Sequence, residues 1–282
     1  MKRALVIALA AVVFIGVLIF KSREPQTRSP ITGRAMGTGW TLAWRGEAPP
    51  QLRGEVAGVL EHWEQVLSQW RDDSDLSRFN RSEPASADLA RVIRLAEVVR
   101  EASGGAFDHY ILENVHAAGY GPPGIGIDLS AIGKGFAADR VGDRLRQLGV
   151  RDFVFELGGE VIAGDGEWPV EIERPTPHRH ETSRTLTLRN RALATSGNYH
   201  QPGHIIDPHT GKPVKRPASS VSVIAADCAT ADAWATALFV RGPDFHDYPK
   251  NLEVSWQYSS NQKSTIVNHQ SSIHPSIPLP QK

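Results

Sequence analysis

Residues 128–139, DLSAIGKGFAAD, place one lysine between Gly133 and Gly135. Glycines let a backbone come close to a ligand, and a neighbouring lysine can contact phosphate oxygens. A P-loop would need glycine at position 128 and serine or threonine at position 135, where this chain has Asp128 and Gly135. The segment therefore predicts either phosphate chemistry of another kind or an ordinary loop at the start of a helix.

A second pattern with chemical meaning is ADAWATAL, residues 231–238. Asp232 and Thr236 are four residues apart in a segment with helical character, so their oxygens are expected on one face, one turn apart. Mg2+ prefers hard oxygen ligands and keeps several waters, so one carboxylate with a hydroxyl or carbonyl suffices. The alternative is that Asp232 caps the helix and Thr236 faces solvent.

The composition favours small-molecule chemistry over nucleic-acid binding. The 282 residues include 31 basic and 31 acidic side chains, without a long run of one charge. A nucleic-acid partner would need a clustered basic surface. Cys228 is the only cysteine, which excludes an internal disulfide and a cysteine-based metal site.

The elements that must position these residues change in type along the chain. Apolar residues recur at helical spacing over residues 52–70, a second helix is predicted from an N-cap at Ser86 to the glycines at 104–105, and a third over about residues 136–148. The short β-branched or aromatic runs DFVFEL, WPVEIE, RTLTLR and SSVSVIA follow. This order predicts an α+β fold with an antiparallel sheet core and flanking helices.

The two ends of the chain differ from this central region. Residues 1–23 hold a 17-residue apolar run between basic residues, which is typical of a secretory signal or a short signal-anchor; we expect an uncleaved anchor in the inner (cytoplasmic) membrane. Residues 24–30 are a polar linker, and residues 31–245 are the predicted domain. Residues 246–282 are rich in Ser, Asn, Gln and Pro, and are expected to form a polar, poorly ordered tail.

Several polar blocks, taken together and in order, resemble the ApbE-type FAD:protein FMN transferases. The resemblance covers about residues 35–242 and is carried by MGTGW, DLSAIGKG, ATSG with HIIDPHTG, and ADAWATAL. It implies a fold related to the T-fold, a place on the periplasmic side of the membrane, and Mg2+-dependent transfer of FMN from FAD to a Thr or Ser hydroxyl of a target protein, with release of AMP. The implied acceptor is a flavin-carrying subunit of a membrane redox complex.

The resemblance also implies roles for individual residues. Asp232, Thr236 and the backbone carbonyl of Ala131 would hold Mg2+. His204 matches the family's general base, and an imidazole titrates in the range needed to accept a hydroxyl proton. The implied FAD-binding residues are Met36, Trp70, Ala106, Phe107, Asp108, Asp128, Lys134, Thr195 and Ile206.

Trp70 has two interpretations. It stands where relatives commonly carry tyrosine, and an indole can stack on a flavin ring. It also belongs to the apolar stripe of the first predicted helix, so it could instead be a core residue.

Two departures from the family pattern leave other functions open. The connection between residues 108 and 128 is short, and a polar tail stands where relatives have a closing apolar helix and strand. A periplasmic flavin-binding carrier without transfer activity would share the FAD contacts. An Mg2+-dependent FAD pyrophosphatase would share the metal and phosphate groups.

Overall fold

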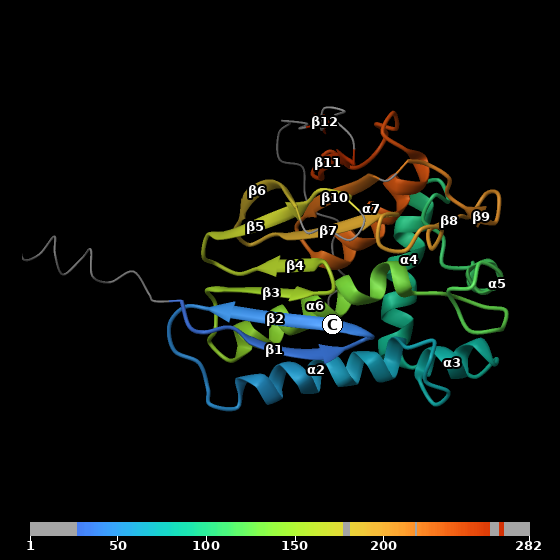
Figure 1. Ribbon diagram of the computed structural model, residues 1–282. Helices are drawn as coiled ribbons and strands as arrows, with labels where there is room; N and C mark the ends of the chain where they lie inside the picture. Colours follow the sequence, from blue (N-terminus) through green and yellow to red (C-terminus); the bar gives the residue numbers. More distant parts are fainter. Residues whose placement is uncertain (1–26, 177–180, 218, 260–264, 268–282) are drawn as a thin grey trace, which may run out of the picture.

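The computed structural model describes residues 27–176, 181–217, 219–259 and 265–267. An eight-stranded sheet forms the centre of this part of the chain (Figure 1). Its strands, in spatial order, are β1 (Ile31–Ala35), β2 (Thr38–Trp44), β3 (Phe153–Leu157), β4 (Glu160–Ala163), β7 (Ala192–Gly197), β10 (Ser219–Ala225), β11 (Glu253–Tyr258) and β12 (Thr265–Val267). All neighbouring strands pair antiparallel.

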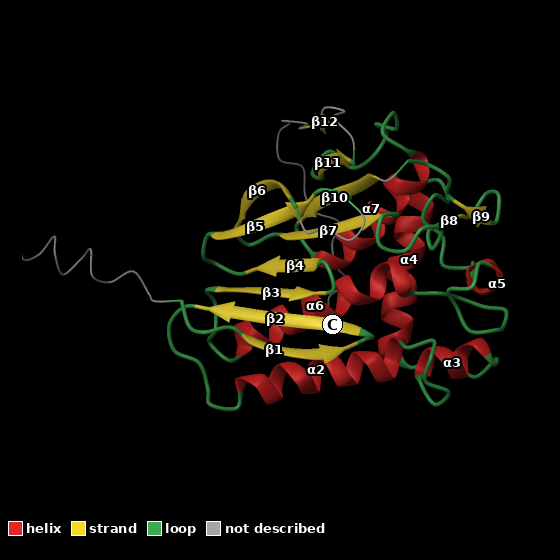
Figure 2. Ribbon diagram, viewed as in Figure 1, coloured by secondary structure: helices red, strands yellow, loops and turns green. Residues whose placement is uncertain are grey.

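Helices and two short hairpins surround the sheet (Figure 2). The helices are α2 (Leu52–Leu67), α3 (Asp75–Asn80), α4 (Ala87–Ala102), α5 (Leu112–Ala117), α6 (Ser130–Gln147) and α7 (Cys228–Arg241). The hairpins pair β5 (Trp168–Glu173) with β6 (Thr182–Leu188), and β8 (Ile206–Asp207) with β9 (Lys212–Pro213). α6 and α7 pack against each other and against the sheet, and α2 packs on α6.

The apolar side chains form a core on each face of the sheet. The larger core lies between the sheet and the helices and includes the fully buried Phe155, Trp234 and Phe239. A smaller core, with Trp168 and Leu193, lies between the sheet and the β5–β6 hairpin. Because both faces are covered, β4 and β10 are buried along nearly their whole length.

The predicted α+β class with an antiparallel sheet is confirmed, as is the helix that begins after Ser86. The Ser86 side chain accepts a hydrogen bond from the Leu89 N–H at 3.1 Å. This is the expected cap, since a serine hydroxyl satisfies one of the free N–H groups of the first turn.

Two predicted helix boundaries are wrong. α6 begins at Ser130 rather than near residue 136, so Lys134 lies within the helix and not in a loop before it. α2 ends at Leu67, and Trp70 follows it with 67% of its surface exposed. The interpretation of Trp70 as a core residue is therefore wrong.

The predicted tail boundary at residue 246 also needs correction. Residues 253–258 form β11, which pairs with β10 and buries Val254 and Trp256. The apolar residues of this strand alternate with polar ones and find partners only once β10 is in place. The predicted N-terminal segment, residues 1–23, and residues 268–282 of the predicted tail lie outside the described residues. In the part of the chain that the structure describes, no helix is both long and apolar enough to span a bilayer.

Candidate active site

The site is built where α6 and α7 touch backbone to backbone. A Cβ atom on Gly135 would lie 2.4 Å from the Cys228 carbonyl oxygen and 2.8 Å from the Asp232 Cβ, so only glycine permits this approach. The Gly135 N–H donates to Asp232 Oδ2 at 3.0 Å. In a regular α-helix that N–H would bond the carbonyl four residues earlier, which is that of Ala131. The Asp232 carboxylate therefore reaches the same N–H toward which the Ala131 carbonyl is directed in a regular helix.

A buried cluster of charges lies beside this contact. Lys134 Nζ is 2.9 Å from Glu160 Oε1, and the side chain of Glu160 is only 4% exposed. Burial tends to lower the pKa of Lys134, but the carboxylates of Asp232 and Glu160 outweigh it and raise this pKa. Burial raises the pKa of Glu160, while the positive charge and hydrogen bond of Lys134 oppose this shift and the charge of Asp232 adds to it. Burial likewise raises the pKa of Asp232.

Two hydroxyls extend the cluster toward β7. Thr236 Oγ1 on α7 is 3.1 Å from Ser196 Oγ. The Thr195 hydroxyl instead bonds Ser222 Oγ at 2.8 Å. Neighbouring residues of a strand point to opposite faces, so Thr195 points away from α7. The structure thus brings Ser196, and not the side chain of the predicted Thr195, to the cluster.

His204 lies within electrostatic reach of the cluster. Its Nδ1 is 2.5 Å from the carbonyl oxygen of Gln201, so Nδ1 carries the proton and donates it. In the neutral ring this leaves Nε2 as a hydrogen-bond acceptor. Burial lowers the pKa of His204, the Gln201 carbonyl opposes this, and the positive charge of Lys134 lowers it further. These contacts favour the neutral, proton-accepting form.

The predicted Asp108 and Ile206 segments meet at a cavity of about 380 Å³. Asp108 lines it together with Arg100, whose Nε lies 3.2 Å from Asp108 Oδ2, and Pro208 and His209 from the turn after β8 line the other side. The side chains of Ala106, Phe107 and Ile206 are buried in the protein, at most 3% exposed. The N–H groups of Ala106 and Phe107 also bond within the protein, both to Ser103.

Asp128 joins the cavity segment to α6. Its N–H donates to the His109 carbonyl at 2.7 Å, and its Oδ1 accepts the Ser130 N–H at 2.7 Å. Its Oδ2 is buried and has no hydrogen-bond partner among the described residues. An unpaired buried oxygen of this kind is suited to a ligand donor.

Met36 lies in the β1–β2 turn and Trp70 in the loop after α2, and Glu64 of α2 contacts both segments. Met36 has a φ of +49°, which is uncommon for a residue with a side chain, and forms the tight β1–β2 turn with Gly37. Its N–H donates to Glu64 at 2.9 Å, and Glu64 also pairs with Arg71, next to Trp70. Glu64 thereby links the Met36 turn to the loop that carries Trp70, whose exposed indole is free to contact a flat ligand.

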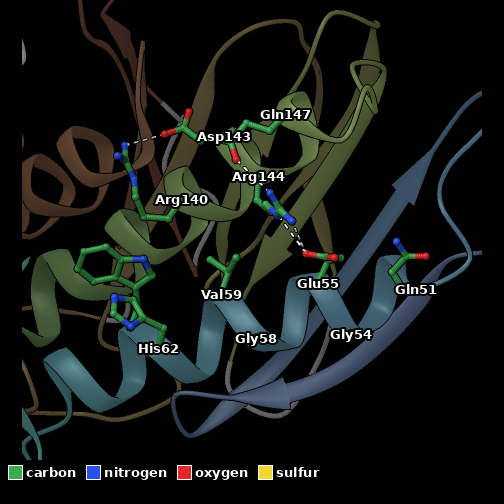
Figure 3. Close-up of a pocket in the computed structure, with 11 residues that line it drawn as sticks. Gln51, Gly54, Glu55, Gly58, Val59, His62, Arg140, Asp143, Arg144 and Gln147 are labelled. Carbon is green, nitrogen blue, oxygen red and sulfur yellow. Dashed lines mark hydrogen bonds and ion pairs between the residues drawn. The ribbon is translucent and has the colours of Figure 1, made fainter. Parts of the chain in front are cut away.

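Another cavity is separate from these residues. It is a groove of about 600 Å³ between α2 and α6 (Figure 3). Its charged side chains pair with each other, Arg144 with Glu55 and Arg140 with Asp143. No predicted site residue lines it.

The cluster fits Mg2+ by the chemistry of its oxygens. Within the described residues, no three His, Cys, Asp or Glu side chains converge as a metal site. An ion at this place would depend on the Asp232 carboxylate and on neutral oxygens from Thr236 and Ala131. Mg2+ accepts such a set because it retains several of its waters.

Sequence reasoning missed two supporting carboxylates, Glu160 and Asp139. Asp139 on α6 accepts the N–H groups of Cys228 and Ala229 at 2.8 and 2.9 Å, at the start of α7. It satisfies free N–H groups of that helix, and the side chain of Asp227, the N-cap residue, accepts a further one from Thr230. Burial raises the pKa of Asp139 to about 7. The sequence signal for Glu160 is the Gly-Gly pair before it, which predicts a hairpin turn after which the second strand begins at this residue.

The fold and the cluster together indicate a class of protein. They form an α+β protein in which a lysine, a buried carboxylate, hydroxyls and a neutral histidine converge, which is a set suited to transfer of a phosphorylated group. The model of the ApbE family matches residues 36–124 and 120–248. The chain belongs to the ApbE family.

Relatives and solved structures agree with this assignment. The FAD:protein FMN transferase of Klebsiella pneumoniae (strain 342) is 28% identical in an alignment of 280 positions that covers 78% of this chain and 80% of the relative. The protein of the same name from Vibrio cholerae is 29% identical in an alignment of 286 positions that covers 81% of this chain and 86% of the relative.

The structure of the flavin transferase ApbE from Vibrio cholerae matches with a TM-score of 0.77 at 27% identity, over 87% of this chain and 98% of that one. The apo form of the Pseudomonas stutzeri flavinyl transferase ApbE matches with a TM-score of 0.75 at 26% identity, over 87% and 95%.

Proposed function

We propose that this protein transfers FMN from FAD to a Thr or Ser hydroxyl of a target protein, forming a phosphoester and releasing AMP, in a reaction that requires Mg2+. FMN transfer from FAD to a protein follows from its family and from the named activity of its relatives. The metal and the phosphoester are the finer part of the proposal, and they follow the expectation from the family resemblance. The observation that carries them is the α6–α7 cluster, in which Lys134, Asp232 and Thr236 converge.

The pyrophosphate of FAD would lie at this cluster. Asp232, Thr236 and the Ala131 carbonyl would hold Mg2+, which when bound supplies charge to neutralise the phosphate oxygens. Lys134 stays protonated because two carboxylates face it, and it adds a fixed positive charge beside the phosphates. The backbone contact at Gly135 sets the position of both α6 and α7 groups before substrate binds, which favours catalysis.

His204 would accept the proton of the incoming hydroxyl. The Gln201 carbonyl fixes the ring with its proton on Nδ1, so Nε2 is the atom that takes up the hydroxyl proton. Burial, together with the positive charge of Lys134, lowers the pKa of His204 and so favours the neutral ring before the hydroxyl arrives.

The remaining predicted residues would bind the rest of FAD. Trp70 would stack on the isoalloxazine ring, with Met36 beside it. Asp108 and Asp128 offer carboxylate oxygens, and Ala106, Phe107 and Ile206 complete the predicted set. We leave the Thr195 side chain out because it points to the other face of the sheet.

The place of action and the acceptor remain proposals. Residues 1–23 would anchor the protein in the inner membrane, with the domain on the periplasmic side, because an apolar run between basic residues is typical of a signal-anchor. A flavin-carrying subunit of a membrane redox complex, reached on that side, would be the acceptor.

A covalent-flavin assay tests the proposed chemistry. The protein is incubated with FAD and an acceptor, with Mg2+ or with EDTA, and the denatured acceptor is inspected for flavin fluorescence. We expect an adduct only with Mg2+, a mass increase equal to bound FMN, and one AMP for each adduct. Free FMN without an adduct would indicate a pyrophosphatase, bound intact FAD would indicate a carrier, and full activity in EDTA would exclude the metal.

A further inference from the structure

Lys134 faces two buried carboxylates but binds only one of them. Its Nζ lies 2.9 Å from Glu160 Oε1. Asp232 lies close by on the neighbouring helix, since its Oδ2 accepts the N–H of Gly135, the residue after Lys134, at 3.0 Å. Its negative charge also acts on Lys134, although the hydrogen bond of the ammonium goes to Glu160.

We propose that Glu160 is a positioning residue that holds Lys134 away from Asp232 and so leaves the Asp232 carboxylate available to a divalent cation. This inference rests on the proposed function, since it concerns the metal ligand assigned there. It adds a residue that the metal and FAD sets do not contain. Lys134 and the metal compete for one carboxylate, and Glu160 decides that competition.

The backbone around Glu160 is suited to this task. Gly158 and Gly159, with φ values of +62° and +106°, form the two-residue turn between β3 and β4. The turn pairs Leu157 with Glu160 and fixes the register of both strands. Glu160 begins β4, which packs against α6, so its carboxylate meets the side of α6 that carries Lys134.

The burial of Glu160 supports a role tied to the lysine. Its side chain is 4% exposed, and Oε2 has no hydrogen-bond partner among the described residues. Burial disfavours an isolated charge, so the contact with Lys134 helps to hold this carboxylate in place. Lys134 is its ion-pair partner.

Loss of the Glu160 charge would redirect Lys134. Attraction between opposite charges is stronger in a buried site than in water. With a neutral residue at position 160, Asp232 is the carboxylate left near the ammonium, and an ion pair there would occupy the metal ligand. The affinity for Mg2+ then falls although every proposed ligand is still present.

A double-mutant cycle on Mg2+ affinity tests this inference. Mg2+ binding to the full chain without FAD is measured by calorimetry for the wild type, Glu160→Gln, Lys134→Met and the double variant. We expect Glu160→Gln to weaken binding at least about tenfold in the wild-type background and less than about twofold in the Lys134→Met background. An equal loss in both backgrounds would show that Glu160 acts on the ion itself, and no loss in either would show that Lys134 does not compete; both results overturn the inference.

A charge-conserving variant separates positioning from a merely structural role. Glu160→Asp keeps the charge, so it is expected to retain Mg2+ affinity within about threefold of the wild type. If Glu160→Asp loses as much affinity as Glu160→Gln while melting at the wild-type temperature, the charge is not what matters and the inference fails. Absence of Mg2+ binding by the wild type would instead refute the proposed metal site, and the inference with it.

Discussion

Replacement of Gly135 by alanine tests whether the contact between α6 and α7 organises the site. The new methyl group would meet the Cys228 carbonyl oxygen at 2.4 Å and the Asp232 Cβ at 2.8 Å. The nearest of these atoms is backbone, which cannot move away as a flexible side chain can. The two helices must therefore separate, and the Gly135 N–H must move away from Asp232 Oδ2.

The expected magnitude comes from two opposing effects. Alanine is favoured over glycine inside a helix by about 0.5–1 kcal/mol. Overpacking of a buried contact costs about 1–3 kcal/mol. The clash is severe enough that we expect the upper part of this range, and a net loss of about 1–2 kcal/mol. For a domain of this size that is a fall in melting temperature of about 2–8 °C.

Gly133 provides a matched control in the same helix. A Cβ there would lie 3.6 Å from Leu67 Cδ1, which is an ordinary contact. Gly133→Ala is therefore expected to raise the melting temperature, by about 1–4 °C. Gly58→Ala, on the exposed face of α2 with nothing within 4 Å, should do the same.

Thermal unfolding without ligands, followed by Mg2+ titration, measures both consequences. Gly135→Ala should lower the melting temperature and also weaken Mg2+ binding, since Asp232 moves relative to the Ala131 carbonyl. If Gly135→Ala stabilises the protein as much as Gly133→Ala does, the close contact does not exist and the account of the site is wrong.

Three further predictions follow from the site and the sheet. His204→Ala should slow FMN transfer about a hundredfold or more while leaving FAD affinity nearly unchanged. Because the pKa of His204 is lowered, the transfer rate of the wild type should stay level at pH values above the ordinary histidine pKa of about 6.5. A pH–rate profile should show the rate falling only below that pH. Trp70→Ala should leave the melting temperature unchanged, since the side chain is 67% exposed, yet weaken FAD binding about 2- to 10-fold in a flavin-fluorescence titration. Trp256→Ala should destabilise the protein by about 3–5 kcal/mol in urea unfolding, whereas a residue in a disordered tail would cause no change.

The sequence predicted correctly those elements whose formation depends on residues within the same segment. The helix after Ser86 was predicted because its cap and its apolar spacing both lie within the segment. β11 was missed because its flanks are rich in Ser, Asn and Gln, and its burial depends on pairing with β10. The start of α6 was missed because Gly133 and Gly135 are poor helix formers. The sequence alone does not show that Gly135 is needed for the contact with α7.

The site residues likewise differ in whether a local pattern is enough to place them. The predicted residues Lys134, Asp232 and Thr236 are brought together, and the spacing on α7 was enough to place the last two on one face. Glu160 could not be assigned to them because its contact with Lys134 depends on the register of the β3–β4 hairpin. The Thr195 side chain was misplaced for a similar reason, since the sequence does not say which face of β7 meets α7.

The two glycines around Lys134 have different physical roles. Packing does not require Gly133, because a methyl group there would make an ordinary contact. It does require Gly135, whose missing side chain lets α7 approach and whose N–H then bonds Asp232. In the proposed reaction, the lysine beside the phosphates and the carboxylate that holds the metal would thereby be positioned by a single helix contact. A change that loosens this contact should impair phosphate and metal binding together, whereas a P-loop would bind phosphate through the glycines of the loop itself.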